Sequence, residues 1–151
     1  MMKGKFLLVL GMSMVVLNLA PLPVLSKGDQ RCEQYEEIFT FQLQTYPMKH
    51  QGGAILNISV AYRLTPEAIT AKKYPNFVPI RKDIDNYLVN YQNESDYWET
   101  VNSGLVKFVL EKYPQMSSVR IEMGVMPTIQ WPFNRSSIVK STRPQSCPLS
   151  L

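Results

Sequence analysis

The segment from Asp96 to Pro127, DYWETVNSGLVKFVLEKYPQMSSVRIEMGVMP, contains the pattern of an amphipathic helix, then a turn and then an alternating strand. Apolar residues recur at the 3.6-residue spacing that places them on one side of a helix. They are Trp98, Val101, Leu105, Phe108 and Val109, with Tyr113 one turn further on. Pro114 cannot continue the helix, and apolar and polar residues alternate from Val119 to Val125, as in a strand with one buried face. We therefore expect this helix to pack on this strand.

Two acidic residues stand at the expected start of this helix. Asp96 is followed three places later by Glu99, which is the spacing of a capping box. In a capping box the two side chains accept hydrogen bonds from backbone N–H groups that the first turn leaves unpaired. The spacing therefore predicts that Asp96 and Glu99 cap the helix.

Three further strands and one further helix are indicated by the same periodicities. Residues 38–46 alternate apolar and polar side chains, and Pro47 is expected to end that strand. Residues 54–64 alternate in the same way and should form a long antiparallel hairpin with the first strand. Helical spacing of apolar residues over 77–91 predicts the first long helix. Residues 135–140 are expected to form a shorter fourth strand.

The order of these elements is strand, strand, helix, helix, strand, strand, which predicts an α+β domain. Each helix has one apolar stripe and each strand one apolar face, so the prediction is a two-layer ββααββ arrangement, a four-stranded antiparallel sheet with two helices on one face. With 151 residues, of which 45% are hydrophobic, the chain can build one core. The other face of the sheet should be polar and either exposed to solvent or in contact with a partner. Its residues are Gln42, Gln44, Asn57, Ser59, Arg63, Arg120 and Glu122.

Residues 1–26 have the three-part form of a secretory signal peptide. Lys3 and Lys5 precede an apolar run from Phe6 to about Ala20, and cleavage is expected after Ser26. The run is too short and too interrupted for a confident membrane span, and a retained N-terminal anchor is the alternative. We therefore expect an exported protein, periplasmic or secreted, with no stable membrane span after cleavage.

The charge of the mature chain gives no indication of a nucleic-acid partner. Removal of Lys3 and Lys5 with the signal leaves 14 basic against 12 acidic residues. The basic residues are scattered and form no run of five or more, which is typical of solvated surface charge.

Two cysteines, Cys32 and Cys147, stand near the two ends of the mature chain. In an exported protein such a pair is most simply a disulfide. The alternative is two free thiols with a catalytic or metal-binding role, and it is weak because His50 is the only histidine. We expect a disulfide, no metal site and no cofactor, with an N-terminal tail over residues 27–37, a domain over 38–140 and a C-terminal tail over 141–151.

The element order over about Ile38 to Lys140 resembles the tunnelling fold shared by dihydroneopterin aldolase, urate oxidase and the pterin synthases. The best local match is the segment 96–127, which looks like the second helix and third strand of dihydroneopterin aldolase. The resemblance implies a homo-oligomer in which subunits join sheet to sheet into a ring-shaped barrel. The polar face would then line a central tunnel, with the helices outside.

The resemblance also implies a role for Glu99. In that family a carboxylate, or an amide in urate oxidase, near the start of the second helix holds the amino-pyrimidine edge of a flat heterocycle, and Glu99 stands at this position. A carboxylate can accept two parallel N–H bonds from a ring edge, and such charged hydrogen bonds are among the stronger ones. The alternative is that Glu99 only caps the helix or lies on the surface.

The catalytic groups of the family are missing from the corresponding positions. Asn76 and Phe77 fall where the aldolase has an Asn-Tyr pair, so the proton-shuttling hydroxyl is absent. Met126 precedes Pro127 where the aldolase has a lysine, so the amine for acid–base work is absent as well. The pterin synthases need three histidines for zinc. The resemblance therefore implies the fold without its known chemistry, and no catalytic residue is assigned.

Three hypotheses about function follow. The first is an exported, non-catalytic homo-oligomer that binds a planar heterocycle of pterin or purine type, held by Glu99 at a subunit interface. The second is a structural or partner-binding ring whose tunnel holds no specific small molecule. The third is a pterin- or purine-type enzyme with an unrecognised site, which the lack of a nucleophile–base pair disfavours.

Overall fold

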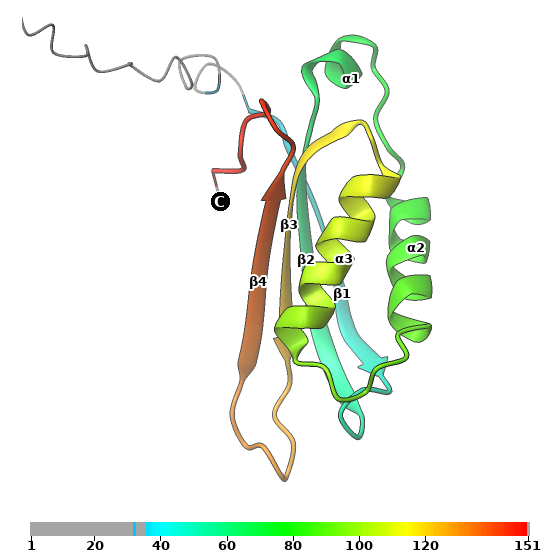
Figure 1. The fold of residues 1–151 in the computed structure, drawn as a ribbon, viewed down its shortest axis with the longest axis vertical. Helices are drawn as coiled ribbons and strands as arrows, with labels where there is room; N and C mark the ends of the chain where they lie inside the picture. The colour runs from blue at the N-terminus through cyan, green and yellow to red at the C-terminus, as the bar shows by residue number, and fades with distance from the viewer. Residues whose placement is uncertain (1–31, 33–35, 151) are drawn as a thin grey trace, which may run out of the picture.

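Four antiparallel strands form one sheet in the order β1-β2-β3-β4, and the two long helices cover one of its faces (Figure 1). The computed structural model describes Cys32 and residues 36–150, so the expected signal segment lies outside the described residues. The strands are β1 (Ile38–Met48), β2 (Ala54–Leu64), β3 (Met116–Val125) and β4 (Arg135–Thr142), and the helices are α1 (Pro66–Thr70), α2 (Phe77–Val89) and α3 (Trp98–Lys112). The two-layer α+β architecture is confirmed, and the short helix α1 is an addition to it.

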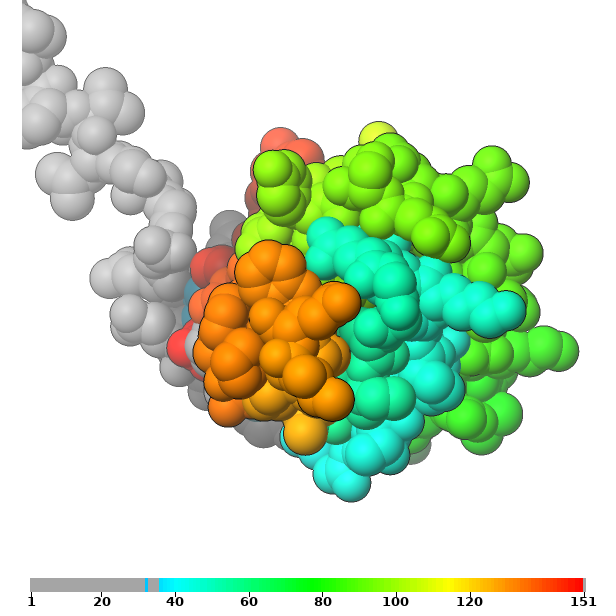
Figure 2. Space-filling view, turned by 90° about the horizontal axis from the view of Figure 1, so that it is seen from below, coloured from blue at the N-terminus to red at the C-terminus, as the bar shows by residue number. Residues whose placement is uncertain are grey.

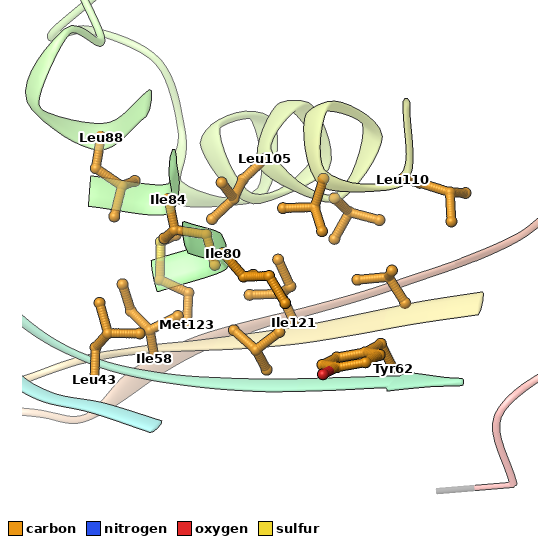
Figure 3. Packing of buried hydrophobic residues seen from close by; sticks show 14 of the residues in the cluster. Leu43, Ile58, Tyr62, Ile80, Ile84, Leu88, Leu105, Leu110, Ile121 and Met123 are labelled. Carbon is orange, nitrogen blue, oxygen red and sulfur yellow. The ribbon is translucent and has the colours of Figure 1, made fainter. Parts of the chain in front are cut away.

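The core fills the space between the helical layer and the sheet. Figure 3 shows Ile80 and Ile84 of α2 and Leu105 of α3 pointing toward Ile58 and Ile121 of the sheet. All five side chains are fully buried. Burial of one such side chain stabilises the fold by roughly 1.5–3 kcal/mol, so the apolar stripes recognised in the sequence provide most of the driving force.

The hairpin β1–β2 departs from the sequence prediction at Pro47, which does not end the first strand. Leu43 lies opposite Ile58, but Tyr46 lies opposite Leu56, so β1 carries one extra residue at this point, a β-bulge. Within the bulge Thr45 has a φ of 50°, and its N–H donates to Asn57 Oδ1 at 3.0 Å. Because β1 is an edge strand, the missing N–H of Pro47 costs the sheet little, and the strand runs on to Met48.

A disulfide joins Cys32 to Cys147, with the two Cα atoms 5.5 Å apart. This is the pairing expected from the sequence. It ties the chain just before β1 to the chain that follows β4. The two ends of the described domain are therefore covalently linked.

The outer face of the sheet, which the sequence predicts to be exposed to solvent or turned to a partner, is covered at one end by the chain itself. Arg63 of β2 points to this face but is only 9% exposed. Its guanidinium lies 3.5 Å from the carboxylate of Glu36 and donates to the carbonyl oxygen of Pro148 at 3.4 Å. Leu149 is also buried. The C-terminal tail thus lies against one end of the predicted polar face.

Among the residues that the structure describes, none of the helices is long and apolar enough to cross a membrane.

Candidate functional site

Three connections of the chain lie together at one end of the molecule. They are the β1–β2 turn, the segment between α2 and α3, and the connection between β3 and β4 (Figure 1). Figure 2 views this end directly and shows the β3–β4 connection, in orange, beside the β1–β2 turn, in teal. Strand and helix direction alternate along the chain, so segments far apart in sequence meet here.

Helix α3 begins at this end without the capping box that the sequence predicted. Tyr97 is the N-cap residue, and its side chain makes no capping hydrogen bond. The carboxylate of Asp96 instead accepts hydrogen bonds from the Tyr91 hydroxyl at 2.5 Å and from Asn93 Nδ2 at 2.7 Å. The spacing of Asp96 and Glu99 was therefore misread, because Asp96 has partners in the loop before the helix.

Glu99 lies in the first turn of α3, with its side chain exposed. Within the described part of the chain, Cys32 and residues 36–150, the Glu99 side chain makes no hydrogen bond or ion pair. The start of a helix is a favourable place for a negative charge, because the helix dipole is positive there. The carboxylate is thus held on a regular element with its oxygen atoms available to a ligand.

His50 attaches the β1–β2 turn to the chain that leads into α3. Its Nε2 lies 2.9 Å from the carbonyl oxygen of Asp96, which also accepts from Gln51 Nε2 at 2.9 Å. A carbonyl oxygen can only accept, so Nε2 carries the proton and Nδ1 is left as an acceptor. The imidazole is fully buried, with its ring centroid 4.5 Å from that of Trp98 and 5.8 Å from that of Tyr91. This cluster holds the start of α3 against the hairpin.

A hollow of about 630 Å³ opens beside Glu99. Its walls include Gln51 of the β1–β2 turn, Trp98 of helix α3, Trp131 of the β3–β4 connection and Arg135, the first residue of β4. A second hollow of about 460 Å³ adjoins it and shares these four residues. The site therefore combines one free carboxylate, one guanidinium and two indole rings, all from one chain.

Three buried polar atoms in these walls have no hydrogen-bond partner among the described residues. They are His50 Nδ1, Trp98 Nε1 and Arg135 Nε. A buried polar atom that stays unpaired costs roughly 1–3 kcal/mol, so these three atoms mark a strained polar cluster behind the hollow. The guanidinium of Arg135 also lies over the Trp131 ring, with its central carbon 5.7 Å from the ring centroid. The hollow itself therefore presents the carboxylate of Glu99 and the guanidinium of Arg135 as its charged groups.

The other positions that the sequence singled out are only partly brought together. Met126 follows β3 at the same end as Glu99, where its sulfur accepts from Asn57 Nδ2 at 3.4 Å. Phe77 is the first residue of α2 and lies at the end of that helix remote from Glu99, with its ring centroid 5.6 Å from that of Phe41. A site within one chain therefore cannot contain both Phe77 and Glu99.

Sequence reasoning missed Gln51, Trp131 and Arg135. A signal for Trp131 was present, because a tryptophan in a turn framed by Pro127 and Pro132 has no helical or strand stripe to which it could belong. Arg135 carried no such signal, since it reads as the first residue of a strand.

No protein-family model and no curated protein matches the sequence. Among solved structures, the chain is similar to the crystal structure of dihydroneopterin aldolase from Burkholderia thailendensis bound to guanine. The TM-score is 0.53 at 11% identity, and the match covers 72% of this chain and 92% of that chain. At this identity the likeness concerns the fold alone. The tunnelling fold that the sequence resemblance predicted is confirmed.

Proposed function

We propose that this protein is an exported, non-catalytic binding protein that holds a small planar heterocycle of pterin or purine type beside Glu99. The observation that carries the proposal is the unpartnered carboxylate of Glu99 at the edge of a hollow that also contains Trp131 and Arg135. The tunnelling fold supports it, because the resemblance places a ring-edge anchor at the Glu99 position.

The chemistry of the walls suits such a ligand. A ring edge with two N–H groups can donate to the two oxygens of Glu99, and hydrogen bonds to a charged group contribute roughly 1.5–3 kcal/mol each. The flat face of the ring can stack on an indole, which adds about 0.5–1.5 kcal/mol. A ring carbonyl oxygen can accept from the guanidinium of Arg135, which lines the same hollow. A planar molecule with donors on one edge and an acceptor on another would therefore use most of the groups present.

We further propose that copies of the chain assemble through the free edges of β1 and β4. Both strands pair with a neighbour on one side only within the described sheet. The outward N–H and C=O groups of an edge strand are a ready surface for pairing with another chain. Light scattering on the mature protein, residues 27–151, should give a discrete multiple of the monomer mass, and a monomer at high concentration would contradict this part of the proposal.

Export is supported by the Cys32–Cys147 disulfide, since such bonds persist in oxidising compartments. Mass spectrometry of the protein recovered from the periplasm or medium of an expressing cell tests it. The expected species starts after Ser26, and an intact N-terminus in the cytoplasm would contradict export.

The test of the ligand is calorimetric titration of guanine and of pterin into the mature protein and into the variant Glu99→Gln. The substitution removes the charge and one acceptor from an exposed position, so the fold should be retained. We expect binding at least tenfold weaker in the variant, which corresponds to a loss of about 1.4 kcal/mol. Glu111→Gln is the matched control, because it makes the same change on the same helix at a side chain that is 68% exposed.

Two results would overturn the proposal. One is the absence of binding by any member of a pterin and purine panel to the folded wild type. The other is equal weakening by Glu99→Gln and Glu111→Gln. Turnover of any panel member would show that the protein is an enzyme, in keeping with the third hypothesis.

A further inference from the structure

A third hollow, of about 740 Å³, lies at the same end of the molecule and is lined mainly by apolar side chains. It is bounded by the end of β1, the start of β2, the end of α2 and the chain that follows β3. Met48, Ile55, Leu88, Val89 and Met126 contribute apolar walls, and Lys49 is its one charged residue. Water at such a surface is readily displaced by an apolar group.

This apolar hollow adjoins the Glu99 site. Gly53, Ala54 and Thr128 line both it and the middle hollow of about 460 Å³. The middle hollow in turn shares Trp98 and Arg135 with the hollow beside Glu99. The three hollows therefore follow one another around the loops that Figure 2 shows at this end of the molecule.

Apolar side chains at the apolar hollow are exposed in the chain by itself. Val89 is 70% exposed, Ile55 41% and Met126 39%. Burial of exposed apolar side chains is favourable, and such a patch marks a binding surface. A ligand that extends from the neighbouring polar site can bury them, so no separate partner is needed. Continuity with the Glu99 site thus indicates what covers them.

We infer that the ligand of this protein is amphipathic, with a planar polar head beside Glu99 and an apolar substituent that lies against Val89 and Met126. The inference rests on the proposed function and adds the class of the substituent. The head is held by hydrogen bonds and stacking, and the substituent by burial of its methylene groups. A ligand with only the head leaves the apolar hollow uncovered and binds more weakly.

The test compares guanine with 9-hexylguanine in calorimetric titrations of the mature protein. Nitrogen 9 of the purine lies opposite the N–H edge that Glu99 would hold, so an alkyl group there extends away from the carboxylate. Each methylene removed from water raises affinity about fourfold, so burial of only part of the hexyl chain should improve binding at least tenfold. Glu99→Gln should weaken both compounds by the same factor.

Variants at the apolar hollow separate the substituent from the head. Val89→Asp should abolish the gain from the hexyl group and leave the affinity for guanine unchanged. Val78→Asp is the matched control, because Val78 is 69% exposed on the same helix at its other end and does not line the hollow. Met126→Gln replaces the side chain by a polar one of similar size and should also reduce the gain in affinity from the hexyl group. This variant replaces Val89→Asp in the test if Val89→Asp fails to fold.

The outcomes are distinguishable. Equal affinities for guanine and 9-hexylguanine in the wild type would overturn the inference and leave heterocycle binding standing. A gain that survives both Val89→Asp and Met126→Gln would also overturn it. If neither compound binds, the proposed function fails and this inference fails with it. If Val89→Asp instead lowers the solution mass of the protein, the apolar hollow is an interface between copies, and the inference is wrong.

Discussion

The Nε2 atom of His50 lies 2.9 Å from the carbonyl oxygen of Asp96, so the only histidine of the chain fastens the β1–β2 turn to the residue that precedes helix α3 by two positions. The two residues are 46 positions apart in sequence. This contact determines where the first turn of α3, and with it Glu99, stands relative to the hairpin.

Removing this contact should destabilise the protein. His50 is fully buried, so His50→Ala leaves a cavity and removes a hydrogen bond, and we expect the free energy of unfolding to fall by about 2–4 kcal/mol. Gln51→Ala, which removes the exposed second donor to the same carbonyl, should cost less than about 1 kcal/mol. Urea denaturation of both variants measures the difference. Equal losses would show that His50 is no more important than a surface residue.

The disulfide should account for a large share of the stability. It closes a loop of 115 residues, and in the chain-entropy model such a link stabilises the folded state by about 4–5 kcal/mol. The double variant Cys32→Ser, Cys147→Ser should lose that amount in guanidinium denaturation, and reductant should lower the wild type to the same level. Reductant should leave the double variant unchanged. Two alkylatable thiols in the untreated protein would refute the pairing.

Stability in acid should depend on Asp83, which connects α2 to the end of α3. The Lys112 ammonium lies 2.7 Å from its carboxylate, and the Tyr113 hydroxyl donates to it at 2.5 Å. The hydrogen bond from Lys112, and then that from Tyr113, holds the pKa of Asp83 below its ordinary value of 3.8. A carboxyl whose pKa is lower in the folded state stabilises the fold above its unfolded pKa, and this contribution is lost as the pH falls through the folded pKa.

We therefore expect the wild type to lose stability from about pH 5 downward, and Asp83→Asn to lose less over the same range. The measurement is the denaturation midpoint at a series of acidic pH values. Glu111→Gln, on the same helix as Lys112, is the control for removal of one surface carboxylate. Identical acid profiles for wild type and Asp83→Asn would contradict the prediction.

Two buried tyrosines should respond in opposite ways to the loss of their hydroxyl groups. The Tyr62 side chain is fully buried, and its hydroxyl has no partner among the described residues. Burial raises its pKa to about 12. Tyr62→Phe removes an unpaired polar group and should leave stability unchanged or raise it by about 1 kcal/mol.

Tyr113→Phe breaks the hydrogen bond to Asp83 and should cost about 1–2 kcal/mol. Thermal unfolding of the two variants at neutral pH gives the comparison. A loss of stability in Tyr62→Phe as large as that in Tyr113→Phe would show that the Tyr62 hydroxyl is satisfied. At alkaline pH, wild type should lose stability as the pH rises above about 10, and Tyr62→Phe should lose less.

The sequence by itself determined the regular elements and the layers. Strand β2 and helices α2 and α3 were predicted because the spacing of apolar residues is a local property, which the chain carries whatever lies next to it. The pairing of Cys32 with Cys147 followed from there being only two cysteines. Glu99 was found through a resemblance in local pattern.

The contacts of individual polar groups were decided by the tertiary structure. Asp96 has the spacing of a capping residue, yet the Tyr91 and Asn93 side chains bind its carboxylate. Arg143, which the sequence places in the C-terminal tail, donates to the carbonyl oxygen of Leu110 near the end of α3 and to that of Met116 at the start of β3. The group to which a polar side chain forms a hydrogen bond depends on distances in the folded chain, and sequence spacing does not give those distances.

The candidate site, too, was determined partly by the sequence and partly by the tertiary structure. The sequence indicated the carboxylate of Glu99, but residues around it also come from the β1–β2 turn, the β3–β4 connection and the start of β4. Trp131 and Arg135 line the same hollow as Trp98 because β3 and β4 pair in one register and α3 packs on both strands. A hydrophobic pattern determines which face of an element is buried, whereas the meeting of three loops at one end of a sheet depends on strand register and helix packing, which only the assembled fold determines.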